Sequence, residues 1–116
     1  MWMNKKSKLV ALEVAIELAQ VLKPALDALK AKNHELWDQA KRAIQSVVLN
    51  LAEGGHSKGG NKGKHYAIAA GSHEELRAAL RTALAFGELT ERDLAAAESI
   101  DDRLGGLVWG LTHPRE

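Results

Sequence analysis

LWDQAKRAIQSVVLNLAEGG, residues 36–55, has the residue pattern of one amphipathic helix. Its apolar residues recur every three or four positions, as on one face of an α-helix, and nothing alternates with the period of a strand. A helix with a single apolar stripe has to bury it against other helices. The expected core face comprises Leu36, Trp37, Ala40, Ile44, Val47, Val48 and Leu51.

The residues around this stretch predict where its helix begins and ends. Asn33 is a good N-cap residue, and Glu35 in the first turn suits the positive end of the helix dipole. Gly54 and Gly55 are expected to end the helix, because glycine takes the left-handed cap conformation easily. The prediction is a helix over residues 34–53, followed by a flexible loop over 54–64 that contains five Gly and three Lys.

Three further segments carry helical periodicity, at about 7–32, 65–86 and 91–111. Pro24 is expected to kink or split the first of them. Gly87 is the predicted C′ residue of the third, and Thr90 with Asp93 has the spacing of a capping box for the fourth. In the first segment the expected core face is Leu9, Leu12, Ile16, Ala19, Leu22, Leu26 and Leu29.

Short links between helices make sequential helices antiparallel neighbours. The chain of 116 residues therefore predicts an all-α fold, a single antiparallel up-down-up-down four-helix bundle spanning residues 1–116. The chain contains no Cys, which excludes disulfides and favours the cytoplasm. No apolar run approaches the roughly 20 residues of a membrane span.

The charge is unevenly distributed, although the formal net charge is only +1. Residues 1–64 hold 11 Lys and Arg against 6 Asp and Glu, or +5, and residues 65–116 hold 5 against 9, or −4. Such asymmetry is typical of a binding face or of head-to-tail assembly.

Tests for chemistry find no catalytic, cofactor or metal site. His73 begins a segment similar to a zinc-protease helix, but Arg77 stands where the second His would be needed. The Gly-rich loop lacks the Gly-Lys-Ser/Thr order of a phosphate-binding loop, and no Glu-x-x-His motif of a di-iron bundle is present. We therefore predict no enzymatic activity.

Polar residues form a second stripe beside the apolar one. Arg42, Ser46, Asn50 and Glu53 share one face of the second helix, and Ser72 and Glu75 follow the mid-helix Gly71 on the third. Gly71 costs about 1 kcal/mol relative to Ala, which suggests close approach of another helix. The stripe is either a solvated face or a contact surface on which Asn50 and Glu53 pair across to another helix or subunit.

These blocks resemble a known family. Gln39-x-x-Arg42-Ala43-x-x-Ser46-Val47-x-x-Asn50-Leu51-Ala52-Glu53-Gly54, followed by Ala69-x-Gly71-Ser72-x-x-Glu75-Leu76, is similar to the four-helix-bundle proteins encoded by intervening sequences in bacterial 23S rRNA genes. The family includes the accessory variability determinant of diversity-generating retroelements. The resemblance implies a cyclic homopentamer in which Arg42, Ser46, Asn50, Glu53, Gly71, Ser72 and Glu75 are structural or interface positions. The retroelement member binds nucleic acid and a reverse transcriptase.

Two functions remain open. The first is weak, non-specific RNA or DNA binding through a ring of basic loops, where avidity adds to modest affinity per chain. Its predicted contact residues are Lys41, Arg42, His56, Lys58, Lys62, Lys64 and His65. A solvated loop is the alternative interpretation of these lysines.

The second is a protein-interaction scaffold that docks a partner such as a reverse transcriptase. Trp2, Trp37 and Trp109 are its candidate contacts, since Trp is enriched at interfaces. For Trp37 and Trp109, a place in the core or in the contact between subunits is the favoured alternative. Gly106 and Gly110 would let the fourth helix approach a neighbour closely.

Overall fold

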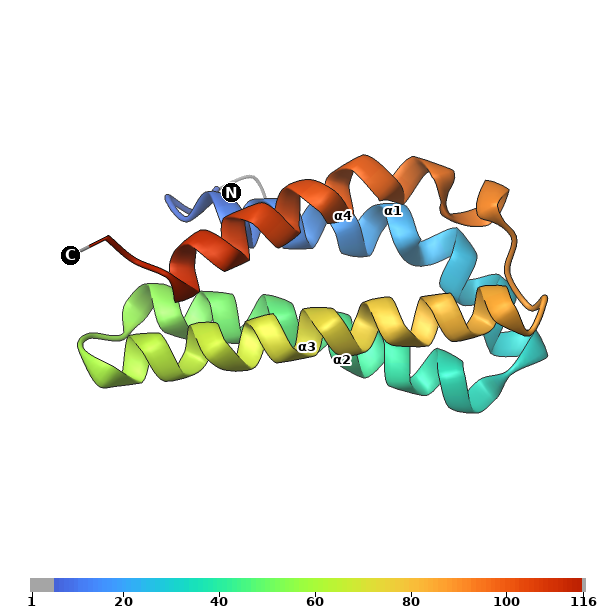
Figure 1. The fold of residues 1–116 in the computed structure, drawn as a ribbon, viewed down its shortest axis with the longest axis horizontal. Helices are drawn as coiled ribbons and strands as arrows, with labels where there is room; N and C mark the ends of the chain where they lie inside the picture. The colour runs from blue at the N-terminus through green and yellow to red at the C-terminus, as the bar shows by residue number, and fades with distance from the viewer. Residues whose placement is uncertain (1–5, 116) are drawn as a thin grey trace.

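The computed structural model describes residues 6–115, and within them the chain forms four α-helices and no strand. The helices are α1 (Val10–Lys32), α2 (His34–His56), α3 (Gly60–Ala85) and α4 (Glu91–Thr112). The start of α1, the α2–α3 link and the end of α4 lie at one end of the molecule, and the other two links lie at the opposite end (Figure 1). The predicted all-α bundle is confirmed.

The core draws on all four helices. Its largest fully buried side chains include Leu18 and Leu22 of α1, Leu51 of α2, Leu76 of α3 and Leu104 of α4. Replacing one such leucine by alanine costs about 2–5 kcal/mol, because the cavity left behind closes only in part.

The amino-terminal half of α1 faces the core with a different stripe from the predicted one. Ala11, Ala15 and Leu18 are buried, whereas Leu12 is half-buried and Ile16 is 38% exposed. Two apolar stripes with helical spacing overlap here, and the stripe with small alanines packs inward. The prediction for Leu22, Leu26 and Leu29 is confirmed.

The helix ends follow the local sequence at three of the predicted positions. The Asn33 side chain accepts a hydrogen bond from the Leu36 N–H at 3.1 Å. Thr90 and Asp93 form the capping box, and Gly87 has a φ of 71°. The predicted split at Pro24 is wrong, since α1 continues through it and the ring is exposed.

The predicted loop over 54–64 is also wrong, because only residues 57–59 lie outside helices. Gly54 stays helical and buried, and a Cβ built on it would overlap the ring of Tyr66. The turn is made instead at Gly59, where φ is 60° and ψ is −136°. Packing of α2 against α3 therefore outweighs the low helix propensity of glycine.

Candidate functional site

The polar stripe forms a hydrogen-bond network between α2 and α3. The hydroxyl oxygens of Ser46 and Ser72 lie 2.7 Å apart, and the Asn50 amide donates to Ser46 Oγ at 3.2 Å and to the Ser46 carbonyl at 2.9 Å. Nδ1 of His65 lies 3.0 Å from Oδ1 of Asn50. Three of the predicted stripe residues, Ser46, Asn50 and Ser72, therefore take part in contacts that join α2 to α3. Ser46 meets Ser72 and Asn50 meets His65, so residue numbers rise along α2 where they fall along α3.

The other predicted members of the stripe point outward. Arg42 pairs with Asp38 on its own helix at 3.3 Å, and Glu53 and Glu75 are exposed. Gly71 is exposed, and a Cβ built on it would meet no described atom of this chain within 4 Å. The expected close approach of another helix to Gly71 is therefore wrong within the chain.

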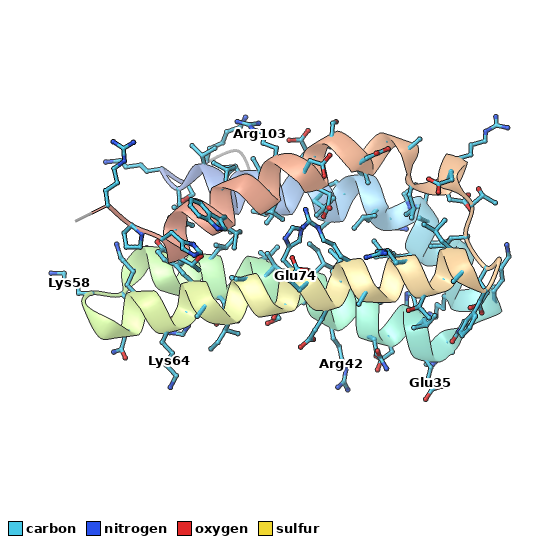
Figure 2. The ribbon with its side chains drawn as sticks, viewed as in Figure 1. Glu35, Arg42, Lys58, Lys64, Glu74 and Arg103 are labelled. Carbon is cyan, nitrogen blue, oxygen red and sulfur yellow. The ribbon has the colours of Figure 1, made fainter. Side chains whose placement is uncertain are left out.

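The predicted nucleic-acid contacts fall into two groups. Lys58 lies in the α2–α3 link, and Lys62 and Lys64 follow in the first turns of α3, all exposed (Figure 2). His56 ends α2 and is also exposed. His65 is half-buried and hydrogen-bonded to Asn50, so it is held by the protein more firmly than its neighbours.

Lys41 and Arg42 lie apart from this basic end. About 14 helical residues separate Arg42 from His56, which corresponds to roughly 21 Å along α2. Figure 2 shows Arg42 well along the bundle from Lys58. The Lys41 Nζ lies 5.1 Å from the Trp37 ring centre. The prediction that these two residues extend the loop patch is therefore wrong for a single chain.

A second polar cluster links α3 to α4, and the sequence analysis did not predict it. His73 is only 2% exposed, and its Nε2 lies 2.6 Å from Oδ1 of Asp101. Arg77 donates through Nε to Oδ2 of Asp101 at 2.8 Å. Its Nη2 lies 2.7 Å from a Cβ built on Gly105, so this glycine leaves room for the guanidinium.

The charges in this cluster stabilise one another. Burial alone would raise the pKa of Asp101, but the hydrogen bonds from His73 and Arg77 outweigh it, so this pKa lies below its ordinary value. Burial alone would lower the pKa of Arg77, but the hydrogen bond and charge of Asp101 raise it overall. The cluster therefore links α3 to α4 through side-chain hydrogen bonds.

The predicted tryptophan contacts differ in exposure. Trp37 is half-buried and packs against the core, whereas Trp109 is 63% exposed and stacks on His113. Gly106 and Gly110 face open space in the chain. Trp2 lies outside the described residues.

Residues 6–115 contain neither a metal-binding cluster nor a membrane-spanning helix. No group of three or more His, Cys, Asp or Glu within that range is arranged to hold a metal ion. None of its helices is long and apolar enough to cross a membrane.

A family model described as 23S rRNA-intervening sequence protein matches residues 7–109. The chain belongs to that family. The match confirms the resemblance of the α2 and α3 blocks and extends it over all of α1 and most of α4. In this 23S rRNA-intervening sequence protein, the matched region contains the α2–α3 network, the basic end and the His73 cluster. No curated protein and no solved structure showed a match.

Proposed function

We propose that this protein is a non-enzymatic, self-associating module of the cytoplasm that binds RNA or DNA weakly and without sequence preference. Its protomer is an antiparallel up-down-up-down bundle, and its assembly is the cyclic homopentamer that the family resemblance implies. The family description, which refers to an rRNA intervening sequence, supports an association with RNA.

The observation that carries the proposal is the basic end of the bundle. Lys58, Lys62 and Lys64 are exposed around the start of α3, and the first turn of α3 contains no acidic residue. The first N–H groups of a helix lack intrahelical acceptors and carry a partial positive charge, which attracts phosphate. Residues 57–64, which contain these three lysines, include no aromatic residue for base stacking, so we expect phosphate contacts without sequence readout.

The outer face of α2 and α3 supports self-association. Leu49 is 64% exposed and Ile68 is 42% exposed, and both lie beside the Ser46–Ser72 contact. Exposed large aliphatic side chains at the same level of two neighbouring helices are typical of an interface. The open space at Gly71 would let a second copy approach this face closely.

The charges on this face suit a second copy. Counted from the Ser46–Ser72 contact, Arg42 lies at the level of Glu75. Around a rotation axis parallel to the helices, α2 of one copy would therefore meet α3 of the next with opposite charges at this level. A ring built this way gathers the basic ends on one side, where avidity strengthens weak phosphate contacts.

The experiment is a salt titration of RNA and DNA binding. We expect binding to fade between roughly 50 and 200 mM salt, as release of counterions requires. Replacing Lys58, Lys62 and Lys64 together by Ala should abolish it without loss of helix. Replacing Lys23, Lys30 and Lys32 of α1 removes the same charge elsewhere and should leave most of the binding. Equal binding by both triple variants would contradict the proposal.

The second candidate function is docking of a partner protein such as a reverse transcriptase. The exposed Trp109 favours it, since Trp is enriched at interfaces. Salt-resistant complex formation with a protein partner, and none with RNA or DNA, would decide for this alternative.

A further inference from the structure

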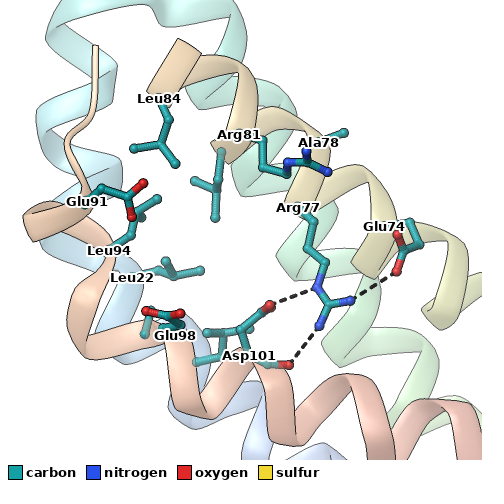
Figure 3. Close-up of a pocket in the computed structure, with 13 residues that line it drawn as sticks. Leu22, Glu74, Arg77, Ala78, Arg81, Leu84, Glu91, Leu94, Glu98 and Asp101 are labelled. Atoms are coloured by element: carbon teal, nitrogen blue, oxygen red, sulfur yellow. Dashed lines mark hydrogen bonds and ion pairs between the residues drawn. The ribbon is translucent and has the colours of Figure 1, made fainter. Parts of the chain in front are cut away.

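A groove opens between α3 and α4, beside the Arg77–Asp101 contact (Figure 3). Its volume is about 480 Å³, within the range of pockets that bind ligands in proteins. Side chains of three helices give it an apolar floor, namely Leu18, Leu22, Leu80, Leu84, Leu94 and Ala97.

The rim of the groove is predominantly acidic. Four acidic and two basic residues line it, and two of the acids belong to the cluster around Arg77. Glu91 and Glu98, on the α4 wall, form no ion pair within residues 6–115. Arg81, on the α3 wall, forms none there either. An incoming segment would therefore meet two available carboxylates on one side and one available guanidinium on the other.

The shape of the groove favours a helix over a small molecule. Its α4 wall runs from Glu91 to Asp101, and ten helical residues span about 15 Å. The groove is bounded by two helices and open to the outside, which suits an amphipathic helix laid along it with its apolar face down. Glu91 and Glu98 are seven residues apart, so they lie on one side of α4 at a spacing of two turns.

We propose that the α3–α4 groove binds a cationic amphipathic helix of a partner protein. Two or three large aliphatic side chains of that helix enter the apolar floor. Two of its Lys or Arg residues, spaced seven apart, pair with Glu91 and Glu98. The Arg77–Asp101 contact fixes the distance between the two walls, so the groove exists before the partner arrives and no ordering of the walls opposes binding.

The test uses the full chain and three labelled synthetic helical peptides of about 14 residues, or four turns. The first combines Lys and Leu at helical spacing, the second has Glu in place of Lys, and the third has Ser in place of Leu. We expect only the Lys/Leu peptide to bind the parent protein. The variant E91K/E98K should lose about tenfold or more of that affinity and bind the Glu/Leu peptide instead.

The control variant E17K/E35K makes the same change in net charge on α1 and α2 and should bind like the parent. Leu84→Ser should weaken binding of the Lys/Leu peptide, because it changes only the apolar floor of the groove. Far-ultraviolet circular dichroism would confirm that this variant keeps its helices. If E91K/E98K and the control lose equal affinity for the Lys/Leu peptide, the peptide is held only by general charge attraction to the protein, and the proposal is overturned. Loss of self-association in E91K/E98K would also overturn it, because the groove would then serve a second copy.

Peptide binding is independent of the proposed binding of nucleic acid. The variant with Lys58, Lys62 and Lys64 replaced should bind the Lys/Leu peptide as the parent does. Failure of one function would therefore leave the other measurable.

Discussion

Nε2 of His73 on α3 lies 2.6 Å from Oδ1 of Asp101 on α4, within a site where the imidazole is 2% exposed. Arg77 donates to the other carboxylate oxygen and to the Asp101 carbonyl. Among the described residues, every side-chain hydrogen bond between α3 and α4 converges on Asp101. Asp101 therefore supplies the polar attachment of α4 to α3, in addition to the apolar contacts that Leu104 and Val108 make in the core.

Replacing Asp101 by Ala should destabilise the fold by about 1–3 kcal/mol, because it leaves the buried His73 ring and the Nε of Arg77 without the carboxylate that they contact. Denaturant unfolding would measure the change. The neighbouring Asp102 is exposed and forms no hydrogen bond or ion pair with His73 or Arg77, so Asp102→Ala should stay within about 0.5 kcal/mol of the parent. Equal effects of the two substitutions would show that the cluster does not hold α4.

Stability should fall in acid through Asp101. Its pKa is lower in the folded chain than the ordinary value of about 3.9, so its contribution is complete above that value. The contribution is lost as the pH falls from about 4 through the lower folded pKa. Unfolding free energy measured between pH 6 and pH 3 should drop more steeply for the parent than for Asp101→Asn. If unfolding free energy falls in parallel for the two proteins, the loss of stability in acid does not come from Asp101.

Two glycines should respond to alanine in opposite directions. Gly54→Ala places a methyl group against the Tyr66 ring and should cost about 1–3 kcal/mol. In the dissociated chain Gly71→Ala meets open space on the helix and should gain up to about 1 kcal/mol. Thermal unfolding of both variants measures the difference, and a destabilising Gly71→Ala would point to a neighbour that the single chain does not contain.

The sequence predicted best those features that depend on nearby residues. The caps at Asn33, Thr90 and Gly87 each involve residues within one helical turn, so their patterns are visible in a short window. The loop prediction failed because Gly54 is chosen for contact with Tyr66, twelve positions later, and not for a turn.

The candidate site was predicted only in part, for the same reason. Ser46, Asn50 and Ser72 were found from helical spacing and family resemblance, and they do meet across α2 and α3. Asp101 was missed because its partners lie 24 and 28 residues away, and no local pattern connects them. His73 was weighed from the sequence as a zinc ligand, and the available signal was that a buried histidine has to be paired.

Charge reversal should test the proposed contact between copies. Arg42→Glu and Glu75→Arg should each weaken self-association, because each places like charges at one level of the interface. The double variant should restore it, since the opposite charges are exchanged and not lost. Sedimentation velocity at equal concentrations measures self-association of all three variants. If the double variant loses as much self-association as the two single variants combined, Arg42 and Glu75 do not pair between copies.

The most direct measurement is the mass of the parent protein in solution by light scattering at micromolar concentration. Self-association as a cyclic homopentamer predicts a mass near five times the 12.6 kDa of one chain. A mass of 12.6 kDa would contradict both the ring and the avidity on which the proposed binding of nucleic acid depends.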